Sequence, residues 1–165
     1  MNSRKRILLV EDSSRDAELI LDALEANQIA KHVVHVRDGA EALDYLHRRG
    51  QYGARTDAQP GLILLDLKLP KVDGLEVLRQ IKSDAGLRMI PVVMMTSSRQ
   101  EQDVVASYEL GVNAYVVKPM KFQDFVEAVK QVDGFWAGIN EVPEGLRASE
   151  TAASPRAPAA GDAPA

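Results

Sequence analysis

Short apolar runs recur along most of the chain. They cover Ile7–Val10, Val33–Val36, Leu62–Leu65, residues 91–95 and Ala114–Val117. Each run is nearly continuous, whereas a strand with one face in water alternates apolar and polar positions. Continuous runs of this length are typical of parallel strands that are buried on both faces. The pattern therefore predicts five buried strands.

Between these runs, apolar residues recur at the spacing of one helix face. The stripes are Ala17, Ile20, Leu21 and Leu24; Leu43 and Leu46; Leu75, Leu78 and Ile81; Val104, Val105 and Tyr108; and Phe122, Phe125, Val126, Val129 and Val132. Ser13, followed three residues later by Asp16, indicates a capping box at the start of the first helix. Five strands that alternate with five helices predict an α/β fold with a doubly wound parallel sheet.

Periodicity alone does not determine the order of the strands in this sheet. Right-handed crossovers leave few arrangements, and the flavodoxin-like order 2-1-3-4-5 is the common one for five strands. Open α/β sheets bind their ligands outside the carboxyl ends of the strands, where the strand order reverses. In this order, that position lies between the first and the third strand.

Both of these strands end in acidic residues. Glu11 and Asp12 follow the first run, and Asp66 follows the third. Three carboxylates in one crevice are costly unless a cation lies among them, and an all-oxygen ligand set suits Mg²⁺ or Mn²⁺ rather than Zn²⁺. For Asp12 alone, capping of the next helix is an equally good explanation. Asp66 also offers a carboxylate nucleophile at the mouth of the cluster.

The fourth and fifth strands end in a hydroxyl and an ammonium group. Thr96 follows the fourth apolar run, and Lys118 follows the fifth. A charge at the end of a buried strand needs a partner, and a phosphate group would accept hydrogen bonds from both side chains. Taken singly, Thr96 has the ordinary explanation of a strand-end residue and Lys118 that of a solvated surface lysine. Together with the acids, they favour phosphoryl chemistry.

The chain resembles the receiver domains of two-component response regulators over residues 4–139. The segments that carry the resemblance are residues 7–12 (ILLVED), 64–74 (LLDLKLPKVDG), 95–97 (MTS) and 117–119 (VKP). Any one of these segments is a weak signal, but all four in the family's order and spacing are specific. The resemblance implies a Mg²⁺-dependent phosphoacceptor that acts as a signalling protein, with its own phosphorylation and slow autodephosphorylation as its only catalysis.

The resemblance also implies a role for each matching position. Asp66 would be the phosphoacceptor. Direct metal ligands would be Asp12, Asp66 and the backbone carbonyl of Lys68, while Glu11 would act through water. Thr96 and Lys118 would bind the phosphoryl group, Tyr115 would turn inward when Thr96 moves, and the peptide between Lys118 and Pro119 would be cis.

Two departures and two alternatives qualify this interpretation. Glu11 is one methylene longer than the frequent aspartate, and Lys68 lies two residues after the acceptor, where it could alter hydrolysis of the phosphoryl group. A haloacid-dehalogenase-type phosphatase also uses an aspartate nucleophile with Mg²⁺, but it requires a second aspartate at the position of Lys68. A receiver-like interaction module that is no longer phosphorylated is the other alternative. The full set of Asp12, Asp66, Thr96 and Lys118 argues against it.

Further segments resemble the single-domain response regulators of bacterial phytochrome histidine kinases. They are the long polar loop at residues 49–61, residues 107–115, and the aromatic residues Phe122, Phe125, Phe135 and Trp136. The resemblance implies a phytochrome-type kinase as partner and a homodimer through the fourth helix, fifth strand and fifth helix. Tyr108, Phe122, Phe125 and Trp136 would form its face. Trp136 has an equally good explanation as a residue that closes the core.

Composition limits the remaining possibilities. At 165 residues the chain is long enough for one domain with a sizeable core. A net charge of −4 gives no support for binding nucleic acid, and the absence of cysteine excludes disulfides and thiol catalysis. The first apolar run is too short for a signal peptide or a membrane span, so we expect a cytoplasmic protein that does not bind membranes.

The end of the chain differs in composition from the rest. We expect a receiver domain over residues 1–140 and a disordered tail rich in alanine and proline over residues 141–165. The sequence shows no effector domain. The expected output is therefore a protein–protein contact or onward transfer of the phosphoryl group.

Overall fold

The structure is a computed structural model, and it describes residues 6–27 and 32–143. Its centre is a five-stranded parallel sheet with the order β2-β1-β3-β4-β5. The strands are β1 (Ile7–Val10), β2 (Val33–Val36), β3 (Leu62–Leu65), β4 (Val92–Thr96) and β5 (Ala114–Val117). The predicted flavodoxin-like fold and strand order are confirmed. β4 begins and ends one residue later than predicted, so Thr96 belongs to the strand.

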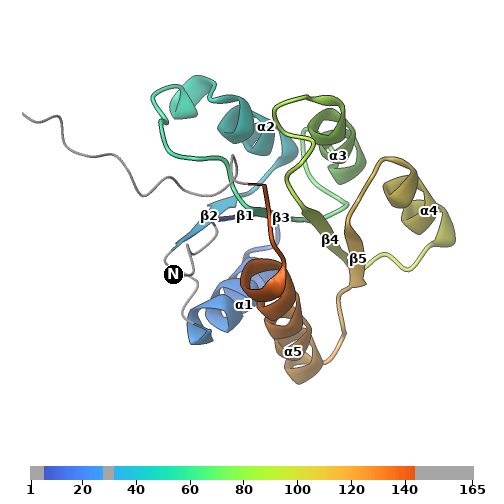
Figure 1. The fold of residues 1–165 in the computed structure, drawn as a ribbon. Helices are drawn as coiled ribbons and strands as arrows, with labels where there is room; N and C mark the ends of the chain where they lie inside the picture. The colour runs from blue at the N-terminus through green and yellow to red at the C-terminus, as the bar shows by residue number, and fades with distance from the viewer. Residues whose placement is uncertain (1–5, 28–31, 144–165) are drawn as a thin grey trace, which may run out of the picture.

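Five α-helices cover the two faces of the sheet, as predicted. They are α1 (Ser14–Ala26), α2 (Gly39–His47), α3 (Gly74–Ser83), α4 (Glu101–Glu109) and α5 (Phe122–Asp133), with a short 3₁₀ helix η2 (Gly50–Tyr52) and a π-helical turn η3 (Gly134–Ile139). Figure 1 shows α1 and α5 side by side on one face and α2, α3 and α4 on the other. The fold therefore has three layers, with the buried sheet between two layers of helices.

Alternation along each buried strand divides the core in two. Ile7 and Leu9 of β1 pack toward α1 and α5, whereas Leu8 and Val10 pack toward α2 and α3. All four side chains are at most 2% exposed. Successive side chains of a strand point to opposite faces, so an unbroken apolar run is the sequence that a sheet covered on both faces requires.

Three helices begin with the same side-chain cap. The side chains of Ser13, Asp38 and Asp73 accept hydrogen bonds from the backbone amides three residues later, at the starts of α1, α2 and α3. Each cap satisfies one of the amides that the first helical turn leaves without a partner. The cap that Ser13 was predicted to form is therefore confirmed. The reciprocal half of the predicted capping box is not formed, because the amide of Ser13 donates to Glu11 instead of Asp16.

α4 presents most of its apolar stripe to solvent. Ser107 is its one buried residue, whereas Val105 is 45% exposed and Tyr108 54% exposed. The hydroxyl of Ser107 donates a hydrogen bond to the carbonyl oxygen of Asp103, at 2.8 Å, which satisfies this polar group inside the helix. The predicted helix is therefore present, and Tyr108 lies at the surface.

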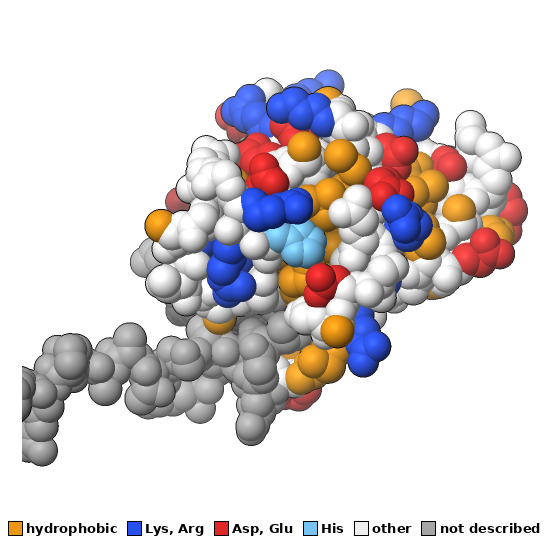
Figure 2. Space-filling view, turned by 90° about the horizontal axis from the view of Figure 1, so that it is seen from above, with side chains coloured by type: hydrophobic (Ala, Val, Ile, Leu, Met, Phe, Trp, Pro, Cys, Tyr) orange, Lys and Arg blue, Asp and Glu red, His pale blue; other side chains and the backbone are white. Residues whose placement is uncertain are grey.

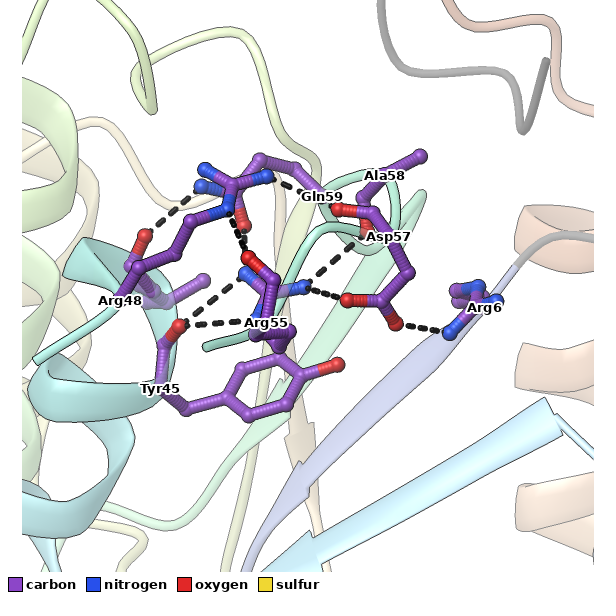
Figure 3. Close-up of polar contacts among 8 residues, drawn as sticks. Arg6, Tyr45, Arg48, Arg55, Asp57, Ala58 and Gln59 are labelled. Carbon is purple, nitrogen blue, oxygen red and sulfur yellow. Dashed lines mark hydrogen bonds and ion pairs between the residues drawn. The ribbon is translucent and has the colours of Figure 1, made fainter. Parts of the chain in front are cut away.

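The long polar loop at residues 49–61 is fixed by Arg55 (Figure 3). Its guanidinium donates hydrogen bonds to the carbonyl oxygen of Tyr45 and to Asp57, Ala58 and Gln59, and it stacks 4.0 Å from the centre of the Tyr45 ring. The Tyr45 carbonyl belongs to the last turn of α2, where carbonyl groups lack helical partners. Arg6, directly before β1, forms an ion pair with Asp57. These contacts therefore hold the loop at the amino-terminal ends of the strands.

The described chain continues past α5 to the opposite core. Val142 is 5% exposed and packs with the residues under α2 and α3, although α5 lies on the other face of the sheet. Figure 1 shows this segment crossing from α5 toward α2. The packed domain therefore extends beyond the predicted boundary at residue 140. Most of the predicted disordered tail, residues 144–165, lies outside the described residues.

Two features of the surface concern possible partners. On the face that carries α2 and α3, basic and acidic side chains are interspersed, with hydrophobic side chains between them (Figure 2). No helix in the described ranges is long and apolar enough to span a membrane.

Candidate functional site

Three carboxylates meet at the carboxyl ends of β1 and β3. Glu11, Asp12 and Asp66 each offer an oxygen, and these oxygens lie within 4.8 Å of one another. The cause is the register of the sheet: Val10 pairs with Leu65, so the residues that follow them emerge side by side. Glu11 is 1% exposed and Asp66 9%, whereas Asp12 faces solvent. The cluster is thus closed on the protein side and open on the other, as a metal site that also takes a substrate requires.

Backbone contacts hold these acids in place. The amide of Asp66 donates to the carbonyl oxygen of Val10 at 3.0 Å, and the amide of Ser13 donates to Glu11 Oε1 at 3.2 Å. After Asp66 the chain passes directly against the start of α3, where the amide of Gly74 donates to the carbonyl oxygen of Leu67 at 2.7 Å. A Cβ atom at position 74 would lie 2.1 Å from the Asp66 carbonyl oxygen. Glycine is therefore required there by space rather than by its backbone angles.

Lys118 supplies a buried positive charge to the cluster. It is 8% exposed, and its Nζ donates to Glu11 Oε2 at 2.7 Å and to Asp66 Oδ2 at 3.2 Å. Burial alone would lower the pKa of Lys118, but its hydrogen bond to Glu11 and the charges of Asp66 and Glu11 outweigh this effect and raise it. Lys118 therefore remains an ammonium ion. Burial raises the pKa of Glu11 to about 7, against the opposing effect of the Lys118 hydrogen bond.

A third acid on Lys118 was missed in the sequence. Asp16 Oδ2 accepts a hydrogen bond from Lys118 Nζ at 2.9 Å. The sequence indicated only a capping role for Asp16, and its backbone amide does donate to the Ser13 hydroxyl, at 3.3 Å. Its carboxylate, however, turns away from the cap and into the crevice. Asp16 lies in the first turn of α1, directly beyond the segment that carries Glu11 and Asp12. Its place close behind these two acids was the signal that could have identified it.

The loop after β4 links Thr96 to Tyr115. Thr96 is 2% exposed, and its hydroxyl oxygen accepts a hydrogen bond from the amide of Ser98 at 3.3 Å. The Tyr115 hydroxyl donates to the carbonyl oxygen of Ser98 at 3.1 Å, and the Ser98 hydroxyl donates to Asp103 Oδ2 at 2.5 Å. Ser98 therefore connects the strand end, β5 and α4. The sequence did not single out Ser98, because its contacts come from three elements far apart in the chain.

These residues line an open cleft of about 480 Å³. Its lining comprises Glu11, Asp12, Ser13, Asp16, Asp66, Lys68, Thr96, Ser97, Ser98, Arg99, Gln100 and Lys118. All the residues predicted to bind metal or phosphoryl groups are among them except Tyr115, which reaches the site through Ser98. The donor set of the cleft is carboxylate, hydroxyl, carbonyl and ammonium, which fits a hard divalent cation beside a phosphate.

Two predictions at the edge of the site are wrong in the structure. The peptide between Lys118 and Pro119 is trans rather than cis. The trans form is the lower in energy for a bond before proline unless the surroundings compel the other, and in this form Lys118 already reaches its three carboxylates. Phe125, predicted on a dimer face, is 4% exposed and packs in the core with α1. Its place in the helical stripe puts it inward.

The other members of the predicted dimer face lie at different depths. Phe122 is 58% exposed and Tyr108 is 54% exposed. Trp136 is half-buried and packs against the core residues of the α1 and α5 face. Of the two explanations for Trp136, the structure supports closure of the core.

Comparison with known proteins identifies the family. The family model of the response regulator receiver domain matches residues 7–130. The chain belongs to this family. Response regulator Rcp1 of Synechocystis sp. is 44% identical over 142 residues, which span 86% of this chain and 95% of Rcp1. The receiver fold and its signalling class, as opposed to a dehalogenase-type phosphatase, are therefore established.

Solved structures of receivers agree with this assignment. The phosphorylated cyanobacterial phytochrome response regulator RcpA is 44% identical and superposes with a TM-score of 0.80, covering 85% of this chain and 99% of its own. The bacteriophytochrome response regulator RtBRR is 60% identical with a TM-score of 0.68, covering 87% of this chain and 86% of its own. A Mn²⁺-bound form of Rcp1 is also known, with a TM-score of 0.79 and 43% identity over 84% of this chain and 99% of Rcp1. The acid cluster of this receiver is consistent with a site for a divalent metal.

Proposed function

We propose that this receiver accepts a phosphoryl group on Asp66 from a histidine kinase, in a reaction that requires Mg²⁺. The observation that carries the proposal is the convergence of Glu11, Asp12 and Asp66 with the buried ammonium of Lys118 in one open cleft. An Asp66 carboxylate oxygen attacks the phosphorus atom of a phosphohistidine. The phosphorus–nitrogen bond breaks, its electron pair returns to the imidazole, and an acyl phosphate forms on Asp66.

The metal and Lys118 divide the work of charge neutralisation. Asp12, Asp66 and the carbonyl oxygen of Lys68 would hold Mg²⁺ directly, and Glu11 would hold it through water. The ion supplies positive charge to the phosphoryl oxygens during transfer. Lys118 binds another of these oxygens from the β5 side. Because the attacking group is a carboxylate, no general base is needed.

Thr96 and Tyr115 would report the modification. On phosphorylation, the Thr96 hydroxyl would exchange its contact with the Ser98 amide for one with a phosphoryl oxygen. Tyr115 holds the carbonyl oxygen of the same residue, so movement of Ser98 would release the Tyr115 ring to turn inward. The change would thus reach the surface formed by α4 and β5. Slow hydrolysis of the acyl phosphate would return the site to its starting state.

The relatives support a phytochrome-type histidine kinase as the partner. RcpA and RtBRR, at 44% and 60% identity, are response regulators of phytochromes. A homodimer through α4, β5 and α5 is the second part of this proposal. β5 is one of the two edge strands of the sheet, and exposed Tyr108 and Phe122 lie on the helices that precede and follow it.

Labelling with a small phosphodonor tests the chemistry. The protein is incubated with acetyl phosphate and Mg²⁺, and the phosphorylated fraction is measured by intact mass. We expect labelling of the wild type, loss of labelling with EDTA, and no labelling of Asp66→Asn. Asp22→Asn, which removes an exposed acid from α1, should be labelled like the wild type. A labelled Asp66→Asn variant would refute the assignment of the acceptor, and an unlabelled folded wild type would favour an inert interaction module.

A further inference from the structure

Asp16 is the one acid of the cleft that contacts Lys118 without belonging to the acid cluster. Its Oδ2 lies 2.9 Å from Lys118 Nζ, but the three grouped oxygens come from Glu11, Asp12 and Asp66. The side chain of Asp16 is 30% exposed, whereas that of Lys118 is 7% exposed. Asp16 therefore touches the buried ammonium from the solvent side.

The position of this pair is the rim of the site. Asp16 and Lys118 line the cleft that contains Asp66, and they also line a neighbouring hollow of about 200 Å³ between α1 and the start of α5. The cleft that a small phosphodonor enters to reach Asp66 is therefore lined in part by this pair. The pair thus separates the reactive cleft from the surface beside it.

The Asp16 carboxylate changes the balance of charge around Lys118. Lys118 is shared by Glu11, Asp16 and Asp66, although phosphoryl transfer needs its charge for the incoming phosphoryl oxygens. A divalent metal would offset two of the three negative charges of the clustered acids, and the charge of Lys118 would offset the third. The carboxylate of Asp16 would then add one net negative charge at the rim. At the rim, this carboxylate weakens the positive potential that attracts an anionic donor.

Helix capping does not explain the carboxylate. The cap of α1 uses the backbone amide of Asp16, which donates to the Ser13 hydroxyl. Asparagine at position 16 would keep this amide and the size of the side chain, and would remove only the charge. Lys118 would keep its contacts with Glu11 and Asp66.

We propose that Asp16 is a specificity-determining residue: by pairing with Lys118 at the rim of the cleft, it disfavours small, doubly charged phosphodonors. This role rests on the proposed phosphorylation of Asp66. It acts on the encounter with the donor rather than on the transfer step, so it depends on the charge of the donor and on the salt concentration. A receiver with this rim is labelled more slowly by small acyl phosphates than one without the Asp16 charge.

Initial labelling rates of wild type and Asp16→Asn with two donors test the proposal. Acetyl phosphate carries two negative charges near neutral pH, and phosphoramidate carries fewer. With excess Mg²⁺ and low salt, we expect Asp16→Asn to be labelled about three- to tenfold faster by acetyl phosphate, as one half-exposed unit charge implies. The gain should be smaller with phosphoramidate, and should shrink for both donors in added salt.

The control and the contrary results are distinct. Glu18→Gln removes an exposed acid from the same helix, away from Lys118, and should leave both rates unchanged. If Asp16→Asn slows both donors equally, the carboxylate serves to hold Lys118 in place and the proposal is wrong. Unchanged rates for a variant that unfolds in urea like the wild type would also overturn it. A wild type that neither donor labels would instead refute the function proposed for Asp66.

Discussion

At the scale of single residues, backbone contacts on both sides of Asp66 restrict the position of this acid. Asp66 N–H is held by β1, and the chain that follows it packs on Gly74 without room for a side chain. In the sequence, Gly74 was only the last residue of the segment 64–74 that resembles the family. Its role in supporting the acceptor depends on the approach of α3 to the loop after β3, which no local pattern reveals.

Gly74→Ala should therefore impair both stability and labelling. The added Cβ would meet the carbonyl oxygen of Asp66 and the Cα of Leu67, and the loop that positions the acceptor would have to move. We expect a loss of about 1–3 kcal/mol in the free energy of unfolding in urea, typical of an overpacked site, and a lower rate of labelling by acetyl phosphate. Gly134→Ala is the matched control. Its Cβ would meet no atom within 4 Å and its backbone is helical, so this variant should be slightly more stable.

Asp133 provides a test of stability against pH. It is 2% exposed, its Oδ2 accepts from Asn27 at 3.2 Å, and its Oδ1 has no hydrogen-bond partner in the described part of the chain. Burial raises the pKa of Asp133, although the Asn27 hydrogen bond opposes this effect. The folded state thus binds the proton more tightly than the unfolded state does. The resulting stability is present below the unfolded pKa and is lost as the pH rises through the folded pKa.

Asp133→Asn should consequently stabilise the protein at neutral pH, because it removes a buried charge. The gain should disappear at about pH 3, below the ordinary aspartate pKa of about 3.9, where the wild-type carboxyl is protonated in the folded and the unfolded state. Urea unfolding at both pH values measures the difference. Asp22→Asn, on the exposed side of α1, should show no such dependence. An equal gain at both pH values would contradict the buried charge as its source.

At the scale of elements, the strands followed from the sequence more completely than the helices and loops. Four of the five strands have the predicted bounds, because a strand buried on both faces must be continuously apolar. The stripe of α4 predicted the helix but not its surroundings, since apolar spacing does not say whether a helix face meets the sheet or solvent. The order within the loop at residues 49–61 was also not predictable. It depends on Arg55 meeting the end of α2 and on Arg6 meeting Asp57 (Figure 3).

Arg55→Ala should destabilise the loop and leave the chemistry intact. The guanidinium is 8% exposed and serves five acceptor contacts, and its loss leaves the Tyr45 carbonyl and Asp57 with fewer partners. We expect about 2–4 kcal/mol less stability in urea. The labelling rate should be unchanged, because the loop lies at the amino-terminal ends of the strands and Asp66 lies at the carboxyl end of β3. Arg49→Ala, which removes an exposed ion pair with Asp44, should change stability by less than about 0.5 kcal/mol. A slower labelling rate for folded Arg55→Ala would show that the loop influences the site at the other end of the strands.

At the scale of the whole molecule, the surface around β5 is the part that one chain leaves uncovered. β5 lies at the edge of the sheet and its residues are half-buried, while Tyr108 and Phe122 beside it are exposed. Exposed aromatic residues next to an edge strand are typical of an interface. The inward position of Phe125 narrows the proposed dimer face to the outer sides of α4 and α5.

The proposed dimer can be tested by a charge on this face. Tyr108→Asp should shift the protein toward the monomer in sedimentation velocity runs, both before and after treatment with acetyl phosphate. The physical reason is that the new carboxylate would be buried in the interface without a partner. Met89→Asp carries the same new charge at an equally exposed position in the segment before β4, outside α4, β5 and α5, and should sediment like the wild type. A wild type that is monomeric under all these conditions would contradict the dimer.

The sequence by itself predicted the five strands of the sheet, the acids that follow β1 and β3, and the types of residue at the site. A run of buried apolar residues forces a two-sided sheet, and parallel strands place Glu11, Asp12, Asp66, Thr96 and Lys118 at one edge. Only the tertiary structure decided which carboxylates bind Lys118 and which aromatic side chains remain exposed. Asp16 turned to Lys118, Phe125 turned inward and Val142 crossed to the other core, because these outcomes depend on side-chain direction and on distances between elements far apart in the chain. The pattern of apolar residues predicts which strands are buried, but contacts between distant segments depend on how the elements pack.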